Sequence, residues 1–111
     1  MVAFPEFMER VAEVDFHNTK SDGSTFVCKV HYFFVSEWLG RPQSRPKEFM
    51  INPRWFPKDH LHYEMMMPAD KDFMTVLFQE DMKHWFMKAQ AFLGPFQAEK
   101  LKPTEIQWVE R

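Results

Sequence analysis

The sequence has a single cysteine, Cys28, and three glycines among its 111 residues. One thiol excludes an internal disulfide framework and zinc sites built from four thiolates, and it is typical of a reducing compartment. The start of the chain has no basic stretch followed by an apolar run, so we predict no secretion signal. No stretch approaches the roughly 18 consecutive apolar residues of a membrane span. We therefore expect a cytoplasmic protein that does not enter a membrane.

An excess of charge of one sign is also lacking. The formal net charge is -2 and the pI is about 6.2, with Lys and Arg spread along the chain. Without a basic cluster, a nucleic-acid polymer is not an expected partner. The composition, 45% hydrophobic and 27% charged, is typical of one globular domain, which we assign to residues 1-111. Thirteen Phe and nine Met predict either a dense core or an aromatic face for a ring-shaped ligand.

The first third of the sequence predicts two antiparallel strands. Residues 7-17 alternate polar and apolar side chains, which indicates a strand with one buried face. The sequence NTKSDGS at 18-24 predicts a hairpin turn, with Gly23 at a positive φ. Residues 25-37 are β-branched or aromatic almost throughout, so we predict a central strand covered on both faces. Within that strand, Cys28 is expected to be a small buried apolar residue.

The remaining sequence predicts a loop, a helix and two strands. Residues 39-53 contain Gly40 and three prolines, which favour a surface loop. Pro68 marks the first turn of a helix that ends near Gln79. Strands are predicted at residues 84-96 and 105-109. The fold class is therefore α+β, with a mixed or antiparallel sheet and one main helix near the C-terminal third.

One helix is too little to cover a sheet on both faces. Either the sheet packs on itself or a second molecule supplies the missing layer. We therefore expect a homo-oligomer formed through an uncovered sheet face.

Four short segments occur in a characteristic order along the chain. They are VHYF at 30-33, GRP at 40-42, PRWF at 53-56 and MMPAD at 66-70. Their order and spacing resemble the carboxy-terminal part of Nudix hydrolases of the oxidised purine nucleoside triphosphatase kind, which are 8-oxo-dGTP diphosphatase-like. The resemblance covers about residues 7 to 98. It implies a Nudix-like mixed sheet, a purine nucleotide as ligand and Mg²⁺ as cofactor.

The catalytic box of that family does not occur in this sequence. The box has the form G-x5-E-x7-R-E-U-x-E-E-x-G-U, and its glutamates hold divalent metal ions against the phosphates. The only glycines are at 23, 40 and 94, and none begins such a box. In the family the box precedes the segment that matches residues 2-16. We therefore expect a truncated Nudix-like domain without catalytic or metal-binding residues, inactive alone, or else a noncatalytic Nudix-like module that binds a nucleotide or dimerises.

The resemblance also implies a base-binding pocket. Asp70 takes the place of one of two aspartates that bind the purine edge in relatives, whereas Ala69 stands in the place of the other. Met67 replaces a neighbouring aromatic residue, and Phe16, Met67 and Phe73 are expected to line the pocket. Two plainer interpretations stay open. Asp70 would also stabilise a helix start by about 0.3 to 1 kcal/mol, and aromatic and Met residues at this spacing are also typical of a core.

Two further groups of residues contain side chains of the metal-binding kind. His60 and His62 would point the same way on an extended segment, with Asp59 and Glu64 nearby, but a third ligand at recognisable spacing is missing. Solvated loop histidines are the preferred interpretation. An acidic residue that approaches the metals in relatives aligns near Met50, two residues from Glu48, and that assignment stays open.

Overall fold

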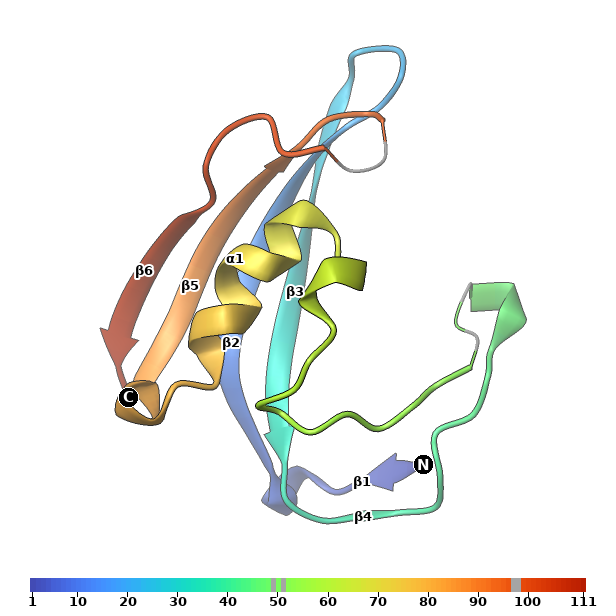
Figure 1. Ribbon diagram of the computed structural model, residues 1–111, viewed down its shortest axis with the longest axis vertical. Helices are drawn as coiled ribbons and strands as arrows, with labels where there is room; N and C mark the ends of the chain where they lie inside the picture. The colour runs from blue at the N-terminus through green and yellow to red at the C-terminus, as the bar shows by residue number, and fades with distance from the viewer. Residues whose placement is uncertain (49, 51, 97–98) are drawn as a thin grey trace.

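The fold is α+β, as the sequence predicts. In the described residues one α-helix lies on one face of a four-stranded mixed sheet, and a small two-stranded sheet lies beside it (Figure 1). The computed structural model describes residues 1-48, 50, 52-96 and 99-111. The larger sheet contains β2 (Met8–Thr19), β3 (Thr25–Val35), β5 (Trp85–Leu93) and β6 (Glu105–Glu110). A two-stranded sheet joins β1 (Val2–Ala3) to β4 (Trp38–Leu39). The helix α1 spans Pro68–Leu77, and short 3-10 helices lie at Pro5–Phe7, Pro46–Glu48, Tyr63–Met65 and Glu80–Met82.

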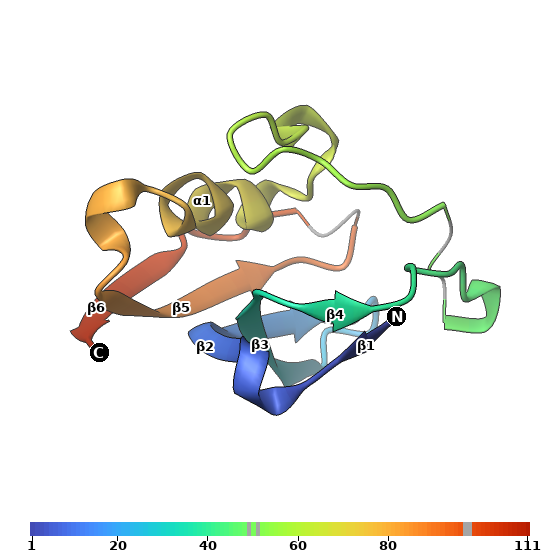
Figure 2. The ribbon, with the colours of Figure 1, turned by 90° about the horizontal axis from the view of Figure 1, so that it is seen from below.

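The strand order in the larger sheet is β3-β2-β5-β6. β2 is antiparallel to β3 and parallel to β5, and β5 is antiparallel to β6. Two parallel strands need a crossover connection, and the segment between β3 and β5 supplies it with α1. That connection places the helix across the sheet, over β5, as Figure 2 shows.

The turn between β2 and β3 forms where the sequence predicts it. The amide of Lys20 donates to the carbonyl of Ser24 over 2.8 Å, and Gly23 has a φ of 87°. The Asp22 carboxylate accepts hydrogen bonds from the amide and hydroxyl of Ser24, and these lower the pKa of Asp22. A residue with a side chain would be strained at the φ of Gly23, so the turn depends on that glycine.

The helix begins and ends close to the predicted positions. Pro68 occupies its first turn, where the missing amide proton costs nothing, and its last residue is Leu77. Ala69, Phe73 and Leu77 are spaced by four residues, and all three are buried against the sheet.

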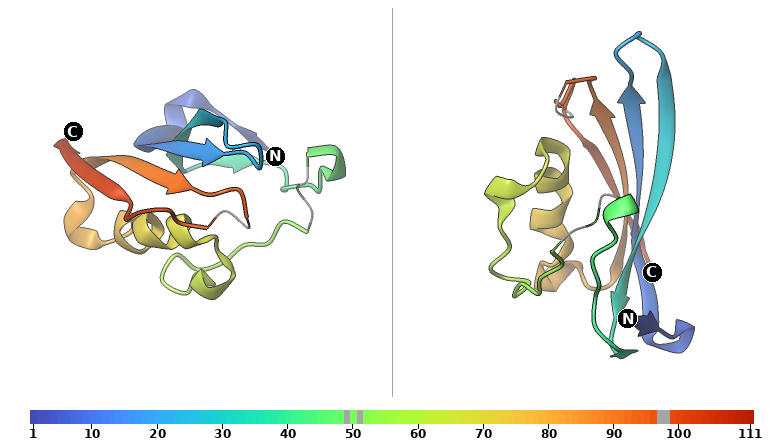
Figure 3. Two further views of the ribbon diagram at one scale, coloured as in Figure 1. Left: turned by 90° about the horizontal axis from the view of Figure 1, so that it is seen from above. Right: turned by 90° about the vertical axis from the view of Figure 1, so that its right-hand side faces the viewer.

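The core lies between α1 and the two central strands. β5 contributes Ala89 and Ala91, whose small side chains let the helix approach the sheet closely. The buried apolar residues of the described chain are Val11, Ala12, Val14, Ala69, Phe73, Leu77, Met87, Ala89, Ala91 and Leu93. The right-hand view of Figure 3 shows the sheet edge-on, with α1 on one side of it.

Two expectations for residues 25-37 are wrong. Within the described residues β3 pairs with β2 alone and lies at the edge of the larger sheet, so it is not a covered central strand. Cys28 is exposed rather than buried. An apolar run predicts a strand but not its place in the sheet, and here the parallel pairing of β2 with β5 gives the central position to β5.

The sheet face opposite α1 is polar on the central strands. Most of the side chains that alternate with the core residues there are polar, namely Glu13, Asp15 and His17 on β2 and Lys88 and Gln90 on β5. The rings of Phe86 and Phe92 on β5 share this face. In the described part of the chain, no helix is long and apolar enough to span a bilayer.

Candidate ligand-binding site

A pocket lies between the start of α1 and the neighbouring strands, and we call it the Asp70 pocket. Its volume is about 360 Å³. The lining residues are Phe16, Asn18, Cys28, Tyr32, Met67, Ala69, Asp70 and Leu93. The β2–β3 register places Phe16 opposite Cys28, so side chains from both strands reach the same side of the sheet as the helix. The pocket therefore combines aromatic walls with a few polar groups.

Asp70 is the acidic group of this pocket. Its side chain is half-buried, and burial raises the pKa of the Asp70 carboxyl above its ordinary value. The pKa of Tyr32 is raised to about 12, first by burial and second by the negative charge of Asp70. Asn18 donates its side-chain amide to the carbonyl of Phe16 over 3.0 Å, which fixes the amide group at the pocket wall.

Three aromatic rings support the pocket from the core side. The buried ring of Phe73 meets Phe16 edge to face, with centroids 6.2 Å apart, and meets Tyr32 in the same manner at 5.6 Å. Such edge-to-face pairs fix ring orientation in addition to burying area. Phe16 and Tyr32 are thereby held with their remaining surfaces toward the pocket.

Three of the four residues that the sequence singled out lie at the wall of this pocket, and the fourth lies behind it. Asp70, Met67 and Phe16 line the pocket. Phe73 does not line it, because its side chain is fully buried behind the rings of Phe16 and Tyr32. Sequence reasoning missed Tyr32, although counting outward from the Gly23 turn would have placed its side chain on the same face as Phe16.

Asp72 lies on the same helix but belongs to a different environment. Its carboxylate accepts hydrogen bonds from Lys100 Nζ over 2.9 Å and from Thr104 Oγ1 over 2.7 Å. Partial burial opposes ionisation, but these two bonds and the charge of Lys100 outweigh it and lower the pKa of Asp72. Asp72 therefore ties α1 to the segment before β6, whereas Asp70 keeps its carboxylate in the pocket.

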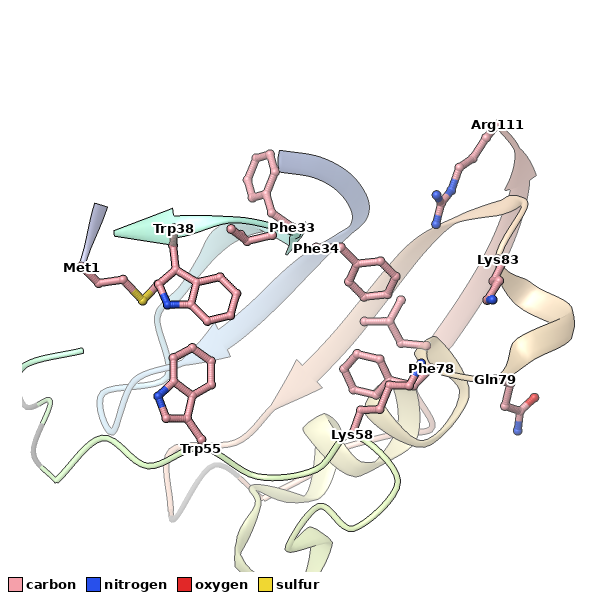
Figure 4. Close-up of a pocket in the computed structure, with 12 residues that line it drawn as sticks. Met1, Phe33, Phe34, Trp38, Trp55, Lys58, Phe78, Gln79, Lys83 and Arg111 are labelled. Atoms are coloured by element: carbon pink, nitrogen blue, oxygen red, sulfur yellow. The ribbon is translucent and has the colours of Figure 1, made fainter. Parts of the chain in front are cut away.

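A second, larger pocket lies at the other end of α1 (Figure 4), with a volume of about 520 Å³. Its walls include two stacked ring pairs. Trp38 faces Trp55 with centroids 5.1 Å apart, and Phe34 faces Phe78 at 5.9 Å. None of its described lining residues is acidic, and none of the residues that the sequence singled out for binding lies there.

The described residues do not fit the Mg²⁺ ion that the resemblance implies. Among them there is no group of three His, Cys, Asp or Glu side chains that could hold a metal ion. His60 lies 3.9 Å from Asp59, and His62 lies 3.9 Å from Glu64, but these are two separate exposed pairs. A magnesium site needs several oxygen ligands on one centre, so no chemical step through a metal follows from this site.

Fold and pocket together define a small α+β domain that can hold a flat ligand with a polar edge. Comparison with family models, curated proteins and solved structures found no match for this chain.

Proposed function

We propose that this protein binds a purine nucleotide in the Asp70 pocket, as the base-recognition part of a Nudix-type hydrolase of the oxidised-purine kind. The observation that carries the proposal is a half-buried carboxylate, Asp70, at the edge of a pocket walled by aromatic rings. The order of the segments VHYF, GRP, PRWF and MMPAD supports the family.

The chemistry of the pocket suits a heterocyclic base. Phe16 and Tyr32 offer ring surfaces for a flat base, and Met67 adds polarisable apolar contact. An ionised Asp70 accepts hydrogen bonds from ring N–H groups, and oxidation of a purine at its five-membered ring adds such a group. At about 360 Å³ the pocket is near the lower end for small-molecule sites, so it would hold the base and leave the phosphates in solvent.

The proposed activity is binding rather than hydrolysis. Hydrolysis of the Nudix kind needs magnesium held by several carboxylates, and the described residues offer no such cluster. We therefore propose a noncatalytic nucleotide-binding role for the chain alone. The exposed free thiol of Cys28 agrees with a reducing, cytoplasmic location.

Calorimetric titration with purine nucleoside monophosphates, with and without oxidation at the five-membered ring, tests the proposal. We expect saturable binding that Asp70→Ala weakens at least about tenfold, the usual loss when a buried charge-assisted hydrogen bond is removed. Asp72→Asn is the matched control, because Asp72 is a helix carboxylate outside the pocket, and it should leave the affinity unchanged. Equal losses in the two variants, or no binding by the unaltered protein, would contradict the proposal.

The same titration at lower pH gives a second readout. Burial raises the pKa of Asp70, so its ionised form is lost at a higher pH than that of an exposed aspartate. Affinity for a ring N–H donor should therefore fall as the pH is lowered through this raised pKa. Asp70→Asn should remove this pH dependence, and a pH dependence that survives in Asp70→Asn assigns the titrating group elsewhere.

A further inference from the structure

The outer edge of β3 is a long row of unpaired backbone groups. Within the described residues, β3 pairs with β2 on one side only, over its length from Thr25 to Val35. Exposed edges of this kind can pair with another chain, and proteins usually protect them with charges, prolines, bulges or short strands. β3 has eleven residues and contains no proline.

The two edges of the sheet differ in this respect. The β6 edge has six residues, with Glu105 and Glu110 at its two ends. On β3 the five residues from Thr25 to Lys29 are all exposed, including Phe26 at 43% and Val27 at 56%. Lys29, whose side chain is 52% exposed, is the one formally charged residue of β3. The β3 edge is therefore longer than the β6 edge and carries a single charge, and it has no partner strand in the described chain.

The hydrogen bonds of the turn between β2 and β3 show which backbone groups of β3 point away from β2. The amide of Lys20 bonds the carbonyl of Ser24, and the β2–β3 register continues from this pair. In an antiparallel ladder every second residue directs both its N–H and its C=O to the same partner. The even-numbered residues near Cys28 thus bond to β2, whereas Val27 and Lys29 direct their backbone groups outward.

We propose that two copies of this protein associate through their β3 edges as antiparallel strands, centred on Cys28, to form one continuous sheet. This inference is independent of nucleotide binding. A twofold axis through the sheet keeps each residue on the same face as its counterpart, so only registers that pair even with even and odd with odd residues are allowed. The register centred on Cys28 places Thr25 opposite His31, Phe26 opposite Val30, Val27 opposite Lys29, and Cys28 opposite Cys28.

Length and charge together select this register over its neighbours. A centre at Val27 would pair only the five residues from Thr25 to Lys29 before the turn begins. A centre at Lys29 would put that lysine opposite its own copy, and like charges directly opposite each other are unfavourable. A centre at Val30 would put Lys29 opposite His31, which already lies 3.4 Å from Arg10. Pairing nearer Val35 is also obstructed, because the segment after β3 extends beyond this edge of the sheet (Figure 1).

The size of the contact sets the expected strength of association. Seven paired residues run about 23 Å along the strands, which corresponds to an interface at the small end of specific complexes. We therefore expect a weak, reversible dimer with a Kd of roughly 10 to 100 µM.

Sedimentation equilibrium of the full chain from about 5 to 500 µM measures this directly. The mass should rise from 13.5 kDa toward twice that value with concentration. Two substitutions at one position test the register, because Val27 faces Lys29 of the second copy twice in each dimer. Val27→Lys should weaken the dimer about tenfold, and Val27→Glu should strengthen it by a similar factor. Unchanged circular dichroism and melting temperature show that both variants are folded.

Thiol mapping gives an independent test of the same register. In a non-hydrogen-bonded antiparallel pair the Cα atoms are about 4.5 Å apart, which a disulfide can bridge. Diamide, which takes up the two electrons and two protons of the thiols, should link two copies through Cys28. In the matched variant Cys28→Ser with Thr25→Cys, the new thiols face His31 and should link far more slowly.

Several outcomes would overturn the proposal. The proposal is wrong if the protein is a monomer at every concentration. It is also wrong if a strand of a different protein, and not a second copy, pairs with β3. Equal responses of Val27→Lys and Val27→Glu would mean that this register does not form. Linkage through a thiol at position 25 as fast as through Cys28 would have the same meaning.

Discussion

The two faces of the larger sheet are formed by the same strands but differ in chemistry, one being apolar and buried and the other mainly polar. On the side of α1, β2 and β5 present Val14, Met87 and Ala89, all of them buried. On the other side the same strands present Asp15 and Gln90, joined by a hydrogen bond of 2.8 Å from Gln90 Nε2 to Asp15 Oδ2. Alternation of side chains along a strand makes this separation possible. It also places the Asp70 pocket on the side where apolar walls are available.

The polar face is held by weaker interactions than the apolar face. Lys29 lies 3.9 Å from Glu13 and 3.8 Å from Asp15, and its side chain is 52% exposed. Exposed ion pairs at such distances contribute about 0 to 1 kcal/mol each. A fully buried aromatic side chain contributes several times more. We infer that stability resides on the helix side, whereas the polar face keeps the sheet from packing there against a second apolar layer.

Phe73→Ala should lower the free energy of unfolding more than any other substitution that we propose. The side chain is fully buried and contacts Phe16 and Tyr32, so its removal leaves a cavity and should lower the free energy of unfolding by about 3 to 5 kcal/mol. Urea unfolding measures this loss. The matched variant on the polar face is Phe92→Ala, whose ring stacks on His17 at 4.8 Å and is partly exposed. It should cost less than about 2 kcal/mol, and equal losses would remove the contrast between the faces.

Asp72→Asn should lower the free energy of unfolding by an intermediate amount, and this loss should depend on pH. Hydrogen bonds from Lys100 and Thr104 lower the pKa of Asp72, so its contribution is present above the unfolded value of 3.8 and is lost as pH falls through the folded pKa. At neutral pH we expect a loss of about 1 kcal/mol, because the side chain is partly exposed to solvent. Denaturant unfolding between neutral and strongly acidic pH measures it.

Asp70→Asn is the control for this pH dependence. Burial raises the pKa of Asp70, so its charge costs stability at neutral pH, and removing that charge should not destabilise the fold. If the two variants lose stability alike, the two carboxylates do not differ as their surroundings indicate.

Local signals in the sequence predicted the elements well. Pro68 marked the start of α1, and Gly23 marked the turn between β2 and β3, because both residues constrain the backbone by themselves. The place of β3 at the edge was not predictable in this way. Strand order depends on the parallel pairing of β2 with β5, which joins residues more than seventy positions apart, and the exposure of Cys28 follows from that order.

The sequence predicts some residues of the candidate site and not others. The resemblance predicts Asp70, Met67 and Phe16 as pocket residues, and all three line one pocket in the fold. Tyr32 and Asn18 were missed because their approach to Asp70 depends on how α1 sits on the hairpin. Secondary structure alone does not specify that packing.

The smallest expected effect belongs to Glu13→Gln on the polar face. Glu13 lies 3.9 Å from both Arg10 and Lys29, and these cations are about half-exposed, so solvent screens both interactions. We expect a loss below about 0.5 kcal/mol in low salt, and a smaller one in high salt, where the Debye length shortens. Urea unfolding at the two salt concentrations measures it. A loss as large as that of Asp72→Asn would mean that the charges of the polar face act as a cooperative network, and would weaken the assignment of stability to the helix side.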